Sequence, residues 1–116
     1  MRILLVEDHL DSRVLLARKL RGDGHPVRAV ETAAEALAAC NEQAFDLILS
    51  DIALPDMSGW ELLSRVRERQ PVKAIALSAF GGPADLERSR AVGFDAHLIK
   101  PIDFQMLATT MAQLAG

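Results

Sequence analysis

A regular alternation of short apolar runs with helix-like segments is the feature that most constrains the fold of this chain. Such runs occupy residues 2–6, 27–30, 46–50, 73–77 and 96–99. Most of them are almost continuously apolar, which is typical of parallel strands covered on both faces. Alternation of strands with helices predicts a mostly parallel sheet with helices on both sides. We therefore expect an α/β protein of the (βα)5 type, a doubly wound parallel sheet.

Helix-capping residues stand where the intervening helices should begin. Thr32 precedes Glu35 by three positions, and Ser58 precedes Glu61 by the same spacing. This spacing is the capping box, in which the first side chain accepts a hydrogen bond from the first turn of a helix. Asp103 is placed to cap the last helix. These signals set helix starts that agree with the strand pattern.

Length and composition describe one globular domain, residues 1–116. No apolar run approaches the roughly 20 residues needed to cross a bilayer, and no leader-like segment opens the chain. We expect a cytoplasmic protein without a membrane contact. The net charge of −3 argues against direct binding of nucleic acid. The basic run RVRER at 65–69 is typical of a solvated helix face.

Polar residues directly follow four of the predicted strands. Glu7 and Asp8 follow the first, Asp51 the third, Ser78 the fourth and Lys100 the fifth. In an open α/β sheet, ligands bind beyond the carboxyl ends of the strands. One carboxylate at a strand end means little, but three acids, a hydroxyl and a lysine at one edge predict a functional site.

The residue types at this edge suit phosphoryl chemistry. Three neighbouring carboxylates repel one another, which raises the pKa of at least one unless a cation intervenes. Mg²⁺ prefers such oxygen ligands and bridges to phosphoryl oxygens. A carboxylate can also act as a nucleophile and form an aspartyl-phosphate. Lys100 and Ser78 would contact the phosphoryl oxygens, and metal and lysine together would offset the cost of burying Asp51 at the mouth of its strand.

Four motifs carry a resemblance that covers essentially the whole chain. They are LLVEDH at 4–9, LILSDIALPDMSGWELL at 47–63, ALSAF at 76–80 and HLIKP at 97–101. In this order and spacing they resemble a response-regulator receiver domain of two-component signalling. The resemblance implies a flavodoxin-like strand order, 2-1-3-4-5.

The resemblance also implies a role for each matching position. Asp51 would be the phosphoacceptor. Asp8 and Asp51 would bind Mg²⁺ directly, with the backbone carbonyl of Ala53 as a third protein ligand. Glu7 would act through a metal-bound water.

Further roles concern the switch. Ser78 would be the switch hydroxyl, Lys100 would pair with the phosphoryl group, and the bond to Pro101 would be cis. His97 stands where receivers often have tyrosine or phenylalanine, so it is either a switching residue or a strand histidine without that role. We expect His9 to be a surface histidine and not a ligand.

The function that follows is a phosphorylation-dependent switch and not an enzyme. A histidine kinase or a histidine phosphotransfer protein would donate the phosphoryl group to Asp51. The switched surface would comprise the fourth helix, fifth strand and fifth helix. GFDAHLIKPID at 93–103 resembles receivers fused to hybrid histidine kinases, which implies that a kinase or output domain can lie outside this chain.

Two alternatives differ from this reading at named positions. A phosphatase of the haloacid-dehalogenase type also uses an aspartate nucleophile and Mg²⁺, but it places a second aspartate two residues later, where this chain has Ala53. A receiver-like interaction module that no longer takes phosphate would be expected to have lost Asp51, Asp8 or Lys100. All three are present.

Overall fold

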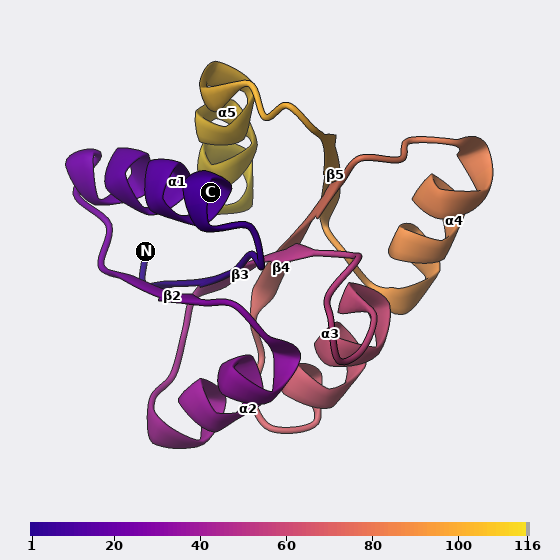
Figure 1. Cartoon of the computed structure of the whole chain (residues 1–116), viewed down its shortest axis with the longest axis horizontal. Helices are drawn as coiled ribbons and strands as arrows, with labels where there is room; N and C mark the ends of the chain where they lie inside the picture. Colours follow the sequence, from indigo (N-terminus) through magenta and orange to yellow (C-terminus); the bar gives the residue numbers. More distant parts are fainter. Residues whose placement is uncertain (116) are drawn as a thin grey trace.

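A computed structural model describes residues 1–115 as a parallel sheet between two layers of helices (Figure 1). The strands are β1 (Ile3–Val6), β2 (Val27–Val30), β3 (Leu47–Asp51), β4 (Lys73–Ser78) and β5 (Ala96–Ile99). The helices are α1 (Leu10–Gly22), α2 (Ala33–Glu42), α3 (Gly59–Arg67), α4 (Pro83–Val92) and α5 (Phe104–Ala115). Gly116, the last residue of the predicted domain, lies outside the described residues.

The strands are all parallel and lie in the order β2-β1-β3-β4-β5. The predicted (βα)5 fold and its strand order are therefore confirmed. Two strands run one residue further than the sequence pattern indicated, because Asp51 and Ser78 still pair in the sheet, with Leu77 and Ile99. Within residues 1–115, none of the helices is long and apolar enough to span a membrane.

The two faces of the sheet bury different side chains of the same strand. Leu4 and Val6 pack in the core beneath α2 and α3, whereas Ile3 and Leu5 pack against α1 and α5. Figure 1 shows α1 and α5 on one side of the sheet and α2 and α3 on the other. Because successive side chains of a strand point to opposite faces, burial on both faces explains why β1 reads as an unbroken apolar run.

The capping residues act as the sequence predicted. The Thr32 hydroxyl oxygen accepts a hydrogen bond from the Glu35 amide at 3.1 Å, and Ser58 accepts one from the Glu61 amide at the same distance. Asp103 accepts hydrogen bonds from backbone amides of the first turn of α5. These caps fix where α2, α3 and α5 begin.

Arg67 corrects the expectation that the 65–69 run is only a solvated face. Its guanidinium donates hydrogen bonds to the carbonyl oxygens of Gly93 and Val72 and to the carboxylate of Asp95. The Asp95 carboxylate also accepts a hydrogen bond from the Ala74 amide at 2.8 Å. Arg67 thus ties the end of α3 to the segments that lead into β4 and β5.

Candidate functional site

The polar residues predicted at the strand ends do come together. Lys100 Nζ lies 2.8 Å from Glu7 Oε2 and 2.7 Å from Asp51 Oδ1. Asp8 follows Glu7 at the end of β1, and Ser78 ends β4 beside Asp51 on β3. The peptide bond between Lys100 and Pro101 is cis, as the resemblance implied.

The turn between β1 and α1 is held by a side chain from α1. Arg13 donates hydrogen bonds from Nη1 to the carbonyl oxygens of Glu7, at 3.0 Å, and Asp8, at 3.4 Å. The Glu7 carboxylate has an exposed fraction of 0% and accepts a hydrogen bond from the His9 amide at 3.1 Å. Glu7 is thus held by its own turn as well as by Lys100, and Asp8 is held by Arg13.

Burial strongly disfavours the ionised form of the Asp51 carboxyl group. It is 3% exposed, and burial together with the neighbouring Glu7 raises its pKa to about 8, although Lys100 opposes the shift. Burial also disfavours ionised Glu7, but contacts with Asp51, Lys100 and the His9 amide outweigh it and lower the Glu7 pKa. Burial alone would lower the pKa of Lys100, but its contacts with Asp51 and Glu7 raise it. Without a metal, burial and the neighbouring Glu7 therefore favour protonation of Asp51 over its ionisation.

The donor set fits a hard divalent cation. Glu7, Asp8, His9 and Asp51 each offer one ligand atom, and these four atoms lie within 4.8 Å of one another. Within residues 1–115, the buried oxygens Asp8 Oδ1 and Asp51 Oδ1 accept no hydrogen bond of good geometry, even though the second forms an ion pair with Lys100. Buried carboxylate oxygens without hydrogen bonds are costly, and a cation bound between them would remove that cost.

A cavity of about 300 Å³ opens over Asp51. Its lining includes Ala53, Ser78 and Lys100, together with Phe80 of the β4–α4 loop. The Ser78 hydroxyl oxygen accepts a hydrogen bond from the Phe80 amide at 2.9 Å, so in this structure it is engaged by its own loop. The cavity gives a phosphoryl donor access to Asp51 alongside the lysine and the hydroxyl.

Gly59 lets α3 begin against the end of β3. Its amide donates a hydrogen bond to the Ile52 carbonyl oxygen at 2.7 Å. A Cβ atom at this position would lie 2.2 Å from the carbonyl oxygen of Asp51 and 2.9 Å from Ile52 Cα. Both neighbours are backbone atoms, so only a residue without a side chain leaves the end of β3 in place.

Replacing Gly59 by alanine is therefore expected to lower the free energy of unfolding by about 2–3 kcal/mol, because the added methyl group must push the backbone at Asp51 aside. Urea unfolding followed by circular dichroism measures the change. Gly22→Ala is the matched control, since a Cβ atom there meets nothing within 4 Å. Equal effects of the two substitutions would contradict the close approach at Gly59.

His97 joins a chain of hydrogen bonds that crosses three elements. Trp60 Nε1 donates to Ser89 Oγ at 2.9 Å, Ser89 Oγ lies 2.8 Å from His97 Nδ1, and His97 Nε2 lies 3.1 Å from the Phe80 carbonyl oxygen. The indole only donates and the carbonyl only accepts. The network therefore places a proton on His97 Nε2, which faces the Phe80 carbonyl oxygen, and pairs Nδ1 with the Ser89 hydroxyl. We call these side chains, Trp60, Ser89 and His97, the α3–α4–β5 relay.

The structure brings one residue to the site that sequence reasoning left on the surface. The His9 side chain is 75% exposed, yet its Nδ1 lies 3.3 Å from Glu7 Oε1 and 3.3 Å from Asp8 Oδ1. The available signal was its position directly after the acidic pair. The His9 ring nitrogen therefore lies close enough to the two carboxylates to bind the same cation as they do.

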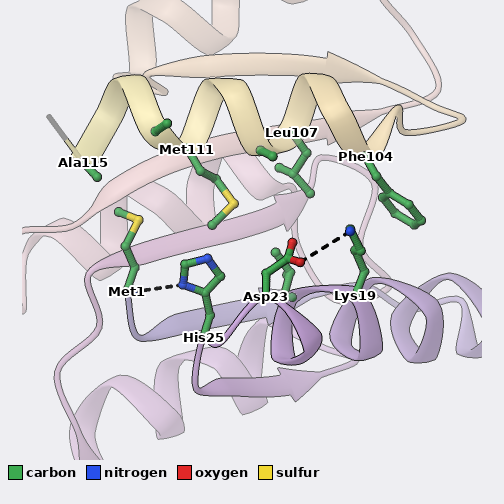
Figure 2. A pocket seen from close by; sticks show the side chains of 11 residues that line it. Met1, Lys19, Asp23, His25, Phe104, Leu107, Met111 and Ala115 are labelled. Carbon is green, nitrogen blue, oxygen red and sulfur yellow. Dashed lines mark hydrogen bonds and ion pairs between the residues drawn. The ribbon is translucent and has the colours of Figure 1, made fainter.

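A separate cavity of about 470 Å³ lies between α1 and α5, near the start of β1 (Figure 2). Its apolar wall includes Phe104, Leu107 and Met111. The Met1 amino group donates to His25 Nδ1 at 3.0 Å, and Lys19 pairs with Asp23 at 3.4 Å. These polar groups satisfy one another, and the cavity includes none of the predicted site residues.

Comparison with known proteins points to one family. Residues 3–112 match the family model described as the response regulator receiver domain. An uncharacterised 14.6 kDa protein of Leptolyngbya boryana is 39% identical over 106 residues, covering 89% of this chain and 81% of that protein. The sensor histidine kinase RcsC of Salmonella typhimurium is 32% identical over 99% of this chain, which spans only 12% of the kinase.

Solved structures agree with the fold. A two-component response regulator from Clostridium difficile superposes with a TM-score of 0.95 at 22% identity, covering 99% of this chain and 95% of its own. The response regulator TrrA of Thermotoga maritima, solved in complex with Mg²⁺-BeF, has a TM-score of 0.86 at 30% identity. That comparison covers 97% of both chains.

Proposed function

Because this chain belongs to the response regulator receiver domain family of two-component signalling, we propose that it accepts a phosphoryl group on Asp51 from a phosphohistidine. The observation that carries the proposal is the environment of Asp51. A carboxyl group only 3% exposed ends β3 beneath an open cavity, with a lysine ammonium 2.7 Å away and a second acid from β1 beside it. A carboxylate that served only to cap a loop would not need this costly setting.

In the proposed transfer, a carboxylate oxygen of Asp51 forms a bond to phosphorus while the bond from phosphorus to the donor imidazole nitrogen breaks. Mg²⁺ would be held by Asp8, Asp51 and the Ala53 carbonyl, with Glu7 acting through water, and would neutralise charge on the phosphoryl oxygens. The Lys100 ammonium, which now contacts the carboxylates of Glu7 and Asp51, would exchange them for oxygens of the phosphoryl group on Asp51. Asp51 must be ionised to attack, so bound cation and nearby ammonium favour the reactive form.

We propose a signalling switch in place of an enzyme that turns over a substrate. Ala53 stands two residues after Asp51, where a phosphatase of the haloacid-dehalogenase type would have its acid, and its side chain carries no proton to donate. All three residues that phosphoryl transfer needs are present: Lys100 contacts Asp51, and Asp8 lies close to Asp51. That retention favours phosphoryl transfer over the alternative of an interaction module that takes no phosphate.

The switched surface would be α4, β5 and α5. A phosphoryl group on Asp51 offers the Ser78 hydroxyl a charged acceptor in place of its bond with the Phe80 amide. Movement of Ser78 would draw the β4–α4 loop with it, and His97 contacts that loop at the Phe80 carbonyl oxygen. The relay would then carry the change from the loop to Ser89 on α4. This would be the switching role that the sequence left open for His97.

The partner would be a histidine kinase or a histidine phosphotransfer protein that docks beside α1. Leu10, Val14 and Leu15 are exposed on α1 although they are apolar. A cavity of about 420 Å³ runs from Leu15 to the β5–α5 loop and reaches Lys100. Apolar helices of a partner laid here would bring a phosphohistidine to Asp51. A kinase or output domain beyond this chain is part of the same proposal.

The test is the intact mass after incubation with acetyl phosphate, with and without Mg²⁺. We expect one added phosphoryl group that requires Mg²⁺ and is absent from Asp51→Asn. If the wild type takes no phosphoryl group and calorimetry detects no Mg²⁺ binding, the interaction module becomes the better reading. A phosphoryl group that persists in Asp51→Asn would place the acceptor elsewhere.

The relay yields a second prediction. Ser89→Ala leaves Trp60 Nε1 and His97 Nδ1 without partners, so we expect the free energy of unfolding to fall by about 1–2 kcal/mol. Ser89→Ala should also lose the change in Trp60 emission that acetyl phosphate and Mg²⁺ cause in the wild type. Trp60 is the only tryptophan of the chain, so the emission reports this site alone.

Ser64→Ala is the control for this pair of measurements. Ser64 also lies on α3 and donates a long 3.4 Å hydrogen bond to the Trp60 carbonyl oxygen, but it is not a member of the relay. An emission change that survives in Ser89→Ala would show that the loop signals to α3 by another route.

A further inference from the structure

We propose that His9 supplies an imidazole ligand to the cation site, so that this chain binds Ni²⁺ and Zn²⁺ more tightly than a site built from oxygen ligands alone. The inference rests on the proposed metal site. It adds a nitrogen donor to the carboxylates Asp8 and Asp51 and to the Ala53 carbonyl, none of which distinguishes these ions strongly from Mg²⁺.

The position of the His9 ring carries the inference. Its Nδ1 lies 3.3 Å from Glu7 Oε1 and 3.3 Å from Asp8 Oδ1. Neighbouring donors around an ion with bonds of about 2.1 Å lie about 3.0 Å apart in an octahedral shell and about 3.4 Å apart in a tetrahedral one. The ring nitrogen and the Asp8 oxygen are therefore spaced like two ligands of one ion.

A second observation comes from buried oxygens on the other side of the proposed ion. Asp51 is 3% exposed, and its Oδ1 accepts no hydrogen bond of good geometry within residues 1–115. Asp8 Oδ1 is also buried without such a bond in the same range. Together with Glu7 and His9 they form the group whose ligand atoms lie within 4.8 Å of one another. A cation between them would satisfy both oxygens.

The imidazole makes one long hydrogen bond, between Nδ1 and Glu7 Oε1 at 3.3 Å, besides its approach to Asp8. His9 is the N-cap residue of α1, but its side chain makes no capping hydrogen bond. The Glu7 oxygen that it approaches already accepts a hydrogen bond from the His9 amide at 3.1 Å. Binding an ion through Nδ1 would leave the ring proton on Nε2, which the neutral imidazole allows.

The types of donor atom determine which metal ions bind more tightly when His9 is present. Imidazole suits Zn²⁺, Cu²⁺ and Ni²⁺, whereas carboxylate, carbonyl and water suit Mg²⁺ and Mn²⁺. Loss of the ring should therefore weaken binding of Ni²⁺ and leave Mg²⁺ nearly unaffected. A histidine that only hydrogen-bonds Glu7 would not separate the two ions in this way.

The experiment is calorimetric titration of Ni²⁺ and of Mg²⁺ into His25→Ala and into the double variant His25→Ala/His9→Asn. The His25→Ala background removes the pair formed by the Met1 amino group and His25, which is another place where Ni²⁺ can bind nitrogen. Asparagine is a preferred N-cap residue, so α1 should still begin normally.

We expect His9→Asn to weaken Ni²⁺ at least about tenfold and to change Mg²⁺ affinity less than about twofold. As a readout of direct ligation, pulsed electron paramagnetic resonance with Cu²⁺ should show a nitrogen coupling that disappears in His9→Asn. Equal Ni²⁺ affinity in the two proteins would overturn the role of His9 and leave the magnesium site standing. Failure of both ions to bind either protein would overturn the proposed metal site itself, and the inference with it.

Discussion

In the absence of divalent cations at pH 7, Asp51→Asn is expected to raise the free energy of unfolding by about 1–3 kcal/mol. Asp51 is almost fully buried beside Glu7, and its ionisation is disfavoured by burial first and by Glu7 second. Asparagine has nearly the same shape and carries no charge, so the folded state no longer bears this cost. Urea unfolding in the presence of EDTA measures the difference.

The pH dependence of this effect has a definite sign. Folding raises the pKa of Asp51 from 3.8 to about 8. Between these values the folded protein binds a proton that the unfolded chain has released, so the contribution of Asp51 to stability falls as the pH rises. The advantage of Asp51→Asn should therefore be absent near pH 4, grow through neutral pH and level off above about pH 8. Unfolding curves recorded across this range test the shape as well as the size.

Asp23→Asn serves as the control for Asp51→Asn. Among residues 1–115, Asp23 forms an ion pair with Lys19 alone, at 3.4 Å on the surface, so its replacement should change stability by less than about 0.5 kcal/mol. Mg²⁺ should narrow the gap between wild type and Asp51→Asn, because only the wild type keeps the full ligand set and ligand binding stabilises the folded state. A variant no more stable than wild type without metal would mean that Lys100 already compensates the charge of Asp51.

The fold was largely predictable because the three central strands, β1, β3 and β4, are buried on both faces. Continuous apolar runs, separated by capping boxes such as Thr32–Glu35, are the direct record of that burial. The order of the strands, by contrast, could not be predicted from local sequence patterns. Nothing local makes β3 pair with β1, so the order 2-1-3-4-5 depended on the family resemblance. The end of β3 was placed one residue short because the strand continues into a charged residue, Asp51.

The site residues placed by the strands were predictable, whereas those placed by loops and helix packing were not. Glu7, Asp51 and Lys100 were predictable because parallel strands deliver their carboxyl ends to one edge, whatever the loops do. The approach of His9 to the carboxylates depends on how the β1–α1 turn is folded, and sequence spacing does not fix that. The bond between Ser89 and His97 requires the placement of α4 against β5. Contacts made by loops and by side chains on separate helices have no periodic signal.

Lys100→Met is expected to lower the free energy of unfolding of the metal-free protein by about 3 kcal/mol at pH 7. Methionine keeps the apolar stem of the side chain but removes the ammonium that lies 2.8 Å from Glu7 and 2.7 Å from Asp51. Contacts with Asp51 and Lys100 are what hold the Glu7 pKa low against burial. Without Lys100, a buried carboxylate either stays unpaired or takes up a proton, and each alternative costs folding energy at neutral pH.

The loss should shrink as the pH falls below the unfolded Glu7 pKa of 4.5, and it should disappear once the pH has passed through the lowered pKa of folded Glu7, because a protonated carboxyl group no longer needs the missing ammonium. Lys19→Met removes a lysine of the same size from a surface pair and should cost less than about 0.5 kcal/mol at any pH. Mg²⁺ should recover part of the stability of Lys100→Met, since it supplies positive charge to the same oxygens. A variant as stable as wild type at pH 7 without metal would show that Glu7 is not held ionised by Lys100, and the assignment of the shared proton to Asp51 would have to be reversed.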